Sequence, residues 1–282
     1  MKTATLLKFA ESEVEKRTHR NYDIIAVYLR GSVVTTESPF LGGAADIDLV
    51  FIHSESPEVS REIQFLTDDV HLDIAHHDQK DYLDRRALRV DPWMGPTLFN
   101  AKVLFDPQHF LNFTLASVRG MFDSPVNIIQ RAQPLAERAR QNWLNLRASS
   151  TNQDNQFIQD YLETLLLAAN SLALLVGDPL TKRSFLNAYS SRVARLNRPG
   201  LYAGLLGLLG AHHVEVAMLE NWISDWDINF VALQKEGCPI NLHPLRRSYY
   251  LRFYVMQLTS EAPKNVLWPL LHTWTQAAAV ES

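Results

Sequence analysis

Residues 45–52 read ADIDLVFI, an apolar run that only Asp46 and Asp48 interrupt. Successive side chains of an extended strand point to opposite faces, so residues two apart share a face. The run therefore predicts a strand on which two carboxylates project side by side and repel each other. Because Asp is depleted in strands and such local conflicts concentrate at functional sites, the pair indicates a cation-binding site.

A Gly-Ser pair, Gly31-Ser32, directly follows another strand-like run, Ile24 to Leu29. Glycine lets the backbone approach a ligand closely, and the N–H groups and hydroxyl at the start of a short helix can bind an anion such as a triphosphate. The same dipeptide is also a common turn in which Ser caps a helix. The pair alone is therefore weak support, and the two aspartates must corroborate it.

A third carboxylate, Asp73, lies in the apolar run Val70 to Ala75. Mg²⁺ prefers oxygen ligands and usually takes one or two carboxylates together with substrate phosphates, and two-metal sites hold ions roughly 3.5–4 Å apart. Asp73 is the candidate third ligand. His71 and His77 share its predicted face, but a hard cation prefers oxygen, so we interpret them as hydrogen-bonded packing.

The chain changes character near Pro107. Before it, a helical pattern at the N-terminus is followed by strand-like runs, of which the last is Lys102 to Asp106. After it, long stretches of 3.6-residue periodicity take over, for example from Ile158 to Val176. These patterns predict an α+β chain, with a small mixed sheet in a first domain (1–115) and an all-α helical bundle in a second (116–282). The boundary is expected between Phe105 and Ser124.

Composition narrows the class of partner. The 282 residues include 27 basic and 31 acidic side chains, so no broad cationic surface favours nucleic acid, and a small-molecule or protein substrate is expected. One cysteine, Cys238, cannot form an internal disulfide, and the N-terminus lacks the apolar core of a signal peptide. A cytoplasmic location is expected.

The longest apolar run, Leu201 to Ala211, is too short for a membrane-spanning helix, which needs roughly 20 residues. No membrane association is expected. Gly204, Gly207 and Gly210 recur at every third position of this run. Small residues at such spacing predict a smooth helix face that packs closely against another helix.

The order of these motifs, an apolar strand, Gly31-Ser32, the Asp46/Asp48 strand and a later lone Asp73, resembles the nucleotidyltransferase superfamily related to DNA polymerase beta. The resemblance covers roughly residues 20–106. The helical second half resembles, in layout, the bacterial aminoglycoside nucleotidyltransferase branch, in which it would form the other wall of the acceptor cleft.

The resemblance implies a role for each matching residue. Gly31 and Ser32 would bind the triphosphate, Asp46 and Asp48 would hold Mg²⁺ (two ions) against its phosphates, and Asp73 would complete the metal site and help to deprotonate the acceptor. The implied reaction moves AMP from ATP, or a nucleoside monophosphate from another NTP, onto a hydroxyl of a small molecule such as an aminoglycoside-like antibiotic, and pyrophosphate leaves. The protein is expected to be a monomer or a homodimer.

The chain departs from the family pattern in two places. Ala45 stands where many relatives have Ser, and the residues directly after Gly31-Ser32 include no Arg or Lys. Lys182 and Arg183, from the helical domain, are candidate triphosphate-binding cations, and Glu163 is a candidate general base. Charged side chains such as lysine, arginine and glutamate more often simply face water.

Two alternatives stay open. A non-catalytic nucleotide-binding or antitoxin-like protein could use the same scaffold, which the missing cation after Gly-Ser favours and the presence of all three aspartates opposes. Transfer to tRNA or to a protein side chain is the other, and it predicts RNA binding that weakens with salt.

Overall fold

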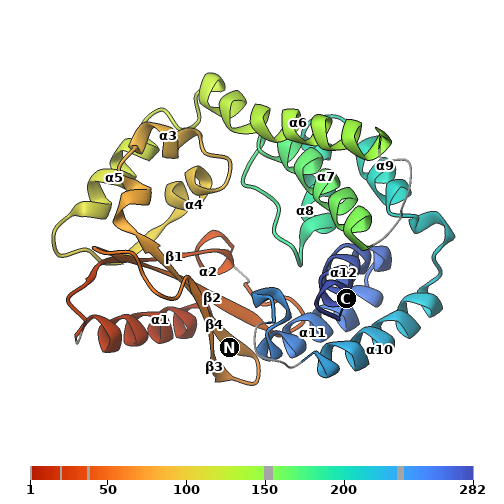
Figure 1. The fold of residues 1–282 in the computed structure, drawn as a ribbon, viewed down its shortest axis with the longest axis horizontal. Coiled ribbons are helices and arrows are strands. Elements are labelled where there is room, and N and C mark those ends of the chain that lie inside the picture. Colours follow the sequence, from red (N-terminus) through yellow and green to blue (C-terminus); the bar gives the residue numbers. More distant parts are fainter. Residues whose placement is uncertain (1, 20, 37–38, 149–154, 234–237, 282) are drawn as a thin grey trace. The chain divides into compact units, whose positions relative to one another are not determined.

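The computed structural model describes residues 2–19, 21–36, 39–148, 155–233 and 238–281. The chain forms two compact units, Met1–Asn127 and Ile128–Ser282. The first contains a five-stranded sheet and the second is helical throughout its described elements, which confirms the predicted α+β class (Figure 1).

The sheet is mixed, as predicted. Its strands are β1 (Ile24–Arg30), β2 (Ala45–His53), β3 (Arg61–Thr67), β4 (Val70–Asp78) and β5 (Lys102–Phe105), in the order β3-β4-β2-β1-β5. β2 and β4 run parallel, and the other neighbouring pairs are antiparallel. Sequence patterns did not reveal β3. It is an edge strand that stays partly or fully exposed along its length, so it contains no continuous apolar run.

Helices cover both faces of the sheet. On one face, α1 (Thr3–Thr18) packs Leu6, Ala10 and Val14 against Ile47 and Leu49 of β2. The opposite face is covered by α3 (Arg85–Val90), α4 (Met94–Asn100) and α5 (Phe110–Arg119). The short helix α2 (Ser32–Thr35) contacts β1 and β2.

The first unit extends beyond the expected domain limit at residue 115. Leu111, Leu115 and Val118 of α5 are fully or almost fully buried in the core that contains Tyr28 and Ile52 of the sheet. Because α5 completes this core, the division between the units falls after Asn127, later than the Phe105–Ser124 interval.

The second unit consists of α6 (Pro125–Ala148, which begins in the first unit), α7 (Asn155–Ala173), α8 (Phe185–Arg195), α9 (Gly200–Leu208), α10 (Val216–Ala232), α11 (Arg247–Leu258) and α12 (Leu267–Glu281). Leucine and alanine side chains form most of its buried clusters, and aromatic rings pack among the buried residues. Phe185 stacks on Trp268 with ring centroids 3.9 Å apart, and Trp226 contacts Tyr250 and Tyr254 edge to face.

The glycines of α9 do not form the predicted packing face. Gly204 and Gly207 are exposed, and a Cβ built at either, or at Gly210, would meet nothing within 4 Å. The helix buries Leu205 and turns its small residues away from the core. Gly210 lies beyond the end of α9 in the left-handed region, at φ 71°.

No helix in the described part of the chain is long and apolar enough to span a membrane.

A hydrogen-bonded chain of charged and imidazole groups joins β2, β3 and β4 on the face covered by α1. His53 Nδ1 lies 2.6 Å from Asp23 Oδ2, His53 Nε2 lies 2.9 Å from His76 Nδ1, and His76 Nε2 lies 3.2 Å from Glu62 Oε1. Arg17 also binds Glu62. Burial raises the pKa of Glu62, but the hydrogen bonds from Arg17 and His76 outweigh it, so the pKa is lowered overall.

This network makes stability depend on pH. A carboxyl whose pKa is lowered by folding stabilises the native state above its unfolded pKa, and the contribution is lost as pH falls. We expect Glu62→Gln to lower the free energy of unfolding at pH 7, and the gap from wild type to shrink as pH falls below the ordinary Glu pKa of 4.5. Urea unfolding across this range measures it.

Exposed Glu58, in the loop between β2 and β3, supplies the matched control. Glu58→Gln should stay close to wild type at every pH. A gap for Glu62→Gln that is constant with pH would contradict the proposed ionic contribution.

Candidate metal centre

Parallel pairing of β2 and β4 brings three aspartates together. The register sets Asp48 opposite Asp73 and Asp46 opposite His71, so all four side chains project from the same face of the sheet. One oxygen from each of Asp46, Asp48 and Asp73 lies within 4.8 Å of the others. Three carboxylates at that separation form an oxygen-only ligand set of the kind that Mg²⁺ prefers.

The trio is only partly open to water. Asp73 is 1% exposed and Asp46 9%, whereas Asp48 is half-buried. Water screens the repulsion between like charges less as burial increases. Cations must therefore compensate these charges, and one compensating cation is present in the protein.

Arg61 of β3 binds Asp73 through both of its carboxylate oxygens. Nε lies 2.6 Å from Oδ1 and Nη2 lies 2.6 Å from Oδ2, which is the two-pronged geometry of a strong Arg–carboxylate pair. In the antiparallel register Arg61 faces Ala75, and its long side chain reaches diagonally to Asp73. A carboxylate offers about four lone-pair positions, so two arginine hydrogen bonds leave Asp73 able to accept a further ligand.

Glycine is the only residue type that fits at position 31, between the end of β1 and the three aspartates. Its φ is 75°, a conformation that side-chain-bearing residues rarely adopt, and a Cβ there would lie 2.2 Å from Oδ2 of Asp48. The glycine therefore lets the backbone at the end of β1 approach the Asp48 carboxylate closely. The hydroxyl of the next residue, Ser32, is buried and makes no hydrogen bond to any residue that the structure describes.

The buried Ser32 hydroxyl, beside the Gly31 turn, fits a ligand that would accept its hydrogen bond. Burying a hydroxyl without a hydrogen bond is unfavourable, by roughly 1–3 kcal/mol. A phosphate oxygen would satisfy Ser32. The residues present thus fit both a divalent cation at the aspartates and an anion at Gly31-Ser32.

The two histidines near the trio are packed. His71 is 4% exposed. His77 Nδ1 lies 2.6 Å from the hydroxyl of Tyr82, which in turn lies 3.1 Å from that of Tyr28. Burial, followed by the nearby charge of Arg30, lowers the pKa of His77 to about 4. His77 is therefore neutral at pH 7, and the contact with Tyr82 fits our interpretation of hydrogen-bonded packing.

Glu163 and Lys182 both belong to the second unit. Glu163 is half-buried on α7, and Lys182 is half-buried in the turn before α8. The charge of Lys182, after the larger effect of burial, lowers the pKa of His272 to about 4. Their assignment as general base and triphosphate-binding cation stays a prediction.

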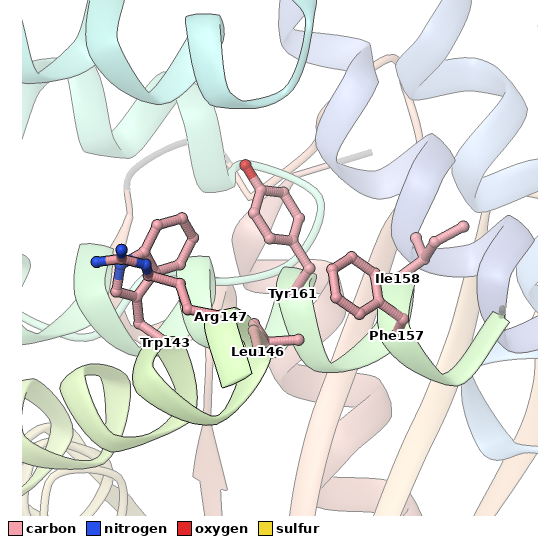
Figure 2. Close-up of a pocket in the computed structure, with 6 residues that line it drawn as sticks. All are labelled: Trp143, Leu146, Arg147, Phe157, Ile158 and Tyr161. Carbon is pink, nitrogen blue, oxygen red and sulfur yellow. The ribbon is translucent and has the colours of Figure 1, made fainter. Parts of the chain in front are cut away.

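A cavity of about 350 Å³ lies between α6 and α7. Figure 2 shows Trp143 and Arg147 projecting from one helix and Phe157, Ile158 and Tyr161 from the other. The described residues of its lining supply a guanidinium and aromatic rings but no carboxylate, a composition that does not favour a polycation such as an aminoglycoside.

An acidic hollow of about 400 Å³ lies in the first unit and is lined by Asp23, Glu55 and Glu58 with two histidines. It sits at the His53 end of β2. Seven residues of extended strand separate that end from Asp46, roughly 23 Å at 3.3 Å per residue. The hollow is therefore too distant to hold an acceptor that reacts at the aspartates.

No protein-family model and no curated protein matches the chain. The function is therefore argued from the geometry of the aspartate trio and its neighbours.

The close approach at Gly31 has a measurable consequence. Gly31→Ala adds a methyl group against the Asp48 carboxylate at a positive φ, and we expect it to lower the free energy of unfolding by about 1–3 kcal/mol. Gly204→Ala is the control, because that helical site is open. It should raise stability by up to about 1 kcal/mol. Urea unfolding of both variants tests this, and equal effects would refute the steric argument.

His77 makes the first unit sensitive to acid. A histidine whose pKa falls on folding supports the native state above its unfolded pKa and ceases to do so as pH falls. Wild-type stability should therefore decline between pH 6.5 and about 4, more steeply than that of His77→Gln. Unfolding titrations at several pH values measure the slopes. The exposed His19→Gln is the control, and parallel slopes for wild type and His77→Gln would contradict the assignment.

Proposed function

We propose that the protein is a Mg²⁺-dependent nucleotidyltransferase that moves a nucleoside monophosphate, with AMP from ATP as the first choice, onto a hydroxyl of a small molecule. One observation carries the proposal: Asp46, Asp48 and Asp73 converge within 4.8 Å beside the close-packed Gly31-Ser32 turn. Acidic oxygens for a cation and an unsatisfied hydroxyl for a phosphate thus stand at one end of the sheet.

The chain's own residues divide the work. Asp46 and Asp48 would hold a divalent cation, and Asp73, which Arg61 keeps in place, would complete the ligand set. Ser32 donates to a phosphate oxygen. Bound Mg²⁺ supplies charge neutralisation for the phosphates and the attacking oxygen. Little covalent chemistry is left for the protein.

The reaction balances without a further reactant. The acceptor oxygen forms a bond to the α-phosphorus, the bond from that phosphorus to the bridging oxygen of the β-phosphate breaks, and pyrophosphate leaves with the electron pair. The hydroxyl proton passes to a base, for which Asp73 and Glu163 are the candidates. The acceptor is proposed as a small polyhydroxylated molecule, of which aminoglycoside-like compounds are one class.

The competing proposal is a nucleotide-binding protein without catalysis. Its supporting feature is the lack of an Arg or Lys directly after Gly31-Ser32. Incubation with ATP, GTP, CTP or UTP, Mg²⁺ and a panel of hydroxyl acceptors separates the two. A nucleotidyltransferase releases pyrophosphate with at least one pair of substrates, and a pure binder with none.

Asp46→Asn tests the metal centre itself. Ligand binding to the folded state raises stability by about 2.7 kcal/mol at a hundredfold excess over Kd, so Mg²⁺ or Mn²⁺ should raise the melting temperature of the wild type. The variant loses a charged ligand and should lose that shift. Without metal, it should melt at or above the wild type, because one of three repelling charges is gone.

Asp123→Asn, at an exposed carboxylate outside the trio, is the matched control and should retain the full metal response. Pyrophosphate release, where the wild type shows it, should fall to background in Asp46→Asn only. A metal-dependent shift that survives in Asp46→Asn would overturn the proposed centre.

A further inference from the structure

Arg30, the last residue of β1, stands next to the candidate metal centre. In the antiparallel register of β1 and β2 it lies directly opposite Asp48, so the two side chains project from the same face of the sheet. It also precedes Gly31 and Ser32 directly in the chain. Strand pairing and chain order thus place Arg30 next to both parts of the proposed site, on the face of the sheet that carries the aspartates.

The guanidinium of Arg30 has no ionic partner in the described part of the protein. The side chain is half-buried, and no ion pair joins it to a described carboxylate. Asp73, the member of the trio most deeply buried, is bound through both oxygens by Arg61. The charge of Arg30 acts on the hydroxyls of Tyr28 and Tyr82 and on the ring of His77.

Such an arrangement is unfavourable without a ligand. Arginine is rarely buried unless it is paired, and its planar fork matches the oxygens of carboxylate and phosphate groups. Two residues along the chain, the buried Ser32 hydroxyl also lacks a hydrogen-bond partner among the described residues. Two donors at one turn thus point independently to an anionic ligand that carries several oxygens.

We propose that Arg30 and Ser32 together bind the phosphate chain of the nucleoside triphosphate, with Arg30 as its cationic partner. This inference rests on the proposed nucleotidyltransferase function and specifies which residues hold its substrate. No Arg or Lys directly follows Gly31-Ser32, and Arg30, which precedes this pair, then supplies the cation.

A different role for Arg30 would be to neutralise the aspartates in place of a metal ion. The two roles make opposite predictions. As a substitute for metal, Arg30 would compete with Mg²⁺, and its removal would strengthen Mg²⁺ binding while phosphate affinity stayed unchanged. As a phosphate-binding residue, its removal weakens the binding of phosphate chains.

The test uses inorganic tripolyphosphate with Mg²⁺ as the probe and isothermal titration calorimetry on the full chain. Arg30→Gln should weaken binding by about tenfold to a hundredfold, the range expected for hydrogen bonds to a charged group. Arg30→Lys keeps the charge but loses the fork, and its affinity should fall between those of wild type and Arg30→Gln. Lys8→Gln, exposed on α1 over the opposite face, removes equal charge and should bind as wild type.

A second measurement checks the position of Arg30 without any ligand. Its charge contributes to the low pKa of His77, so Arg30→Gln should raise that pKa in an NMR titration, with the resonance assigned through His77→Gln. Lys8→Gln should not. An unchanged His77 pKa in a folded Arg30→Gln variant would overturn the placement on which the proposal depends.

The outcomes separate this inference from the proposed function. If wild type binds neither tripolyphosphate nor any nucleotide with Mg²⁺, both the proposed function and the inference about Arg30 are refuted. If wild type binds and Arg30→Gln binds equally well, only the role of Arg30 is refuted. A loss in Arg30→Gln with near-native circular dichroism, together with partial retention in Arg30→Lys, supports it.

Discussion

The parallel pairing of β2 with β4 is the constraint from which the site follows. Both strands are central in the sheet and covered on both faces, so neither can shift its register without exposing its apolar side chains. That register sets Asp48 beside Asp73 and holds Asp46 next to them. Electrostatic repulsion alone would drive the carboxylates apart, and the apolar residues of the two strands hold them together.

Two features accommodate this concentration of negative charge. Arg61 reaches across from the edge strand and compensates Asp73, and Gly31 lets the end of β1 pass within van der Waals range of Asp48. The opposite end of β2 carries a separate network through His53 and His76 on the other face. The hydrogen-bonded network around His53 and His76 and the three aspartates thus lie at opposite ends of β2 and on opposite faces of the sheet.

Strand alternation accounts for what could be predicted from the sequence. Asp46, Asp48 and Asp73 lie in apolar runs, so their shared face follows from a period of two. Arg61 was not predictable in this way, because β3 is an exposed edge strand and its pairing partner is set by register. Arg30 carries no comparable sequence signal, because its place opposite Asp48 follows from the pairing of β1 with β2. In α9, small residues at regular spacing mark an exposed face, since burial of Leu205 sets the orientation of that helix.

Under the proposed function, charge balance favours the binding of metal and triphosphate together at this site. Three aspartates with the neighbouring Arg30 and Arg61 carry three negative and two positive charges, a net charge of one negative. Two divalent ions alone would leave the site strongly positive, and a triphosphate alone, with about four negative charges, would be repelled by the aspartates. Bound together, they return the site close to its original charge. Each ligand should therefore raise the affinity for the other by the same factor, because a coupling free energy between two binding events is reciprocal.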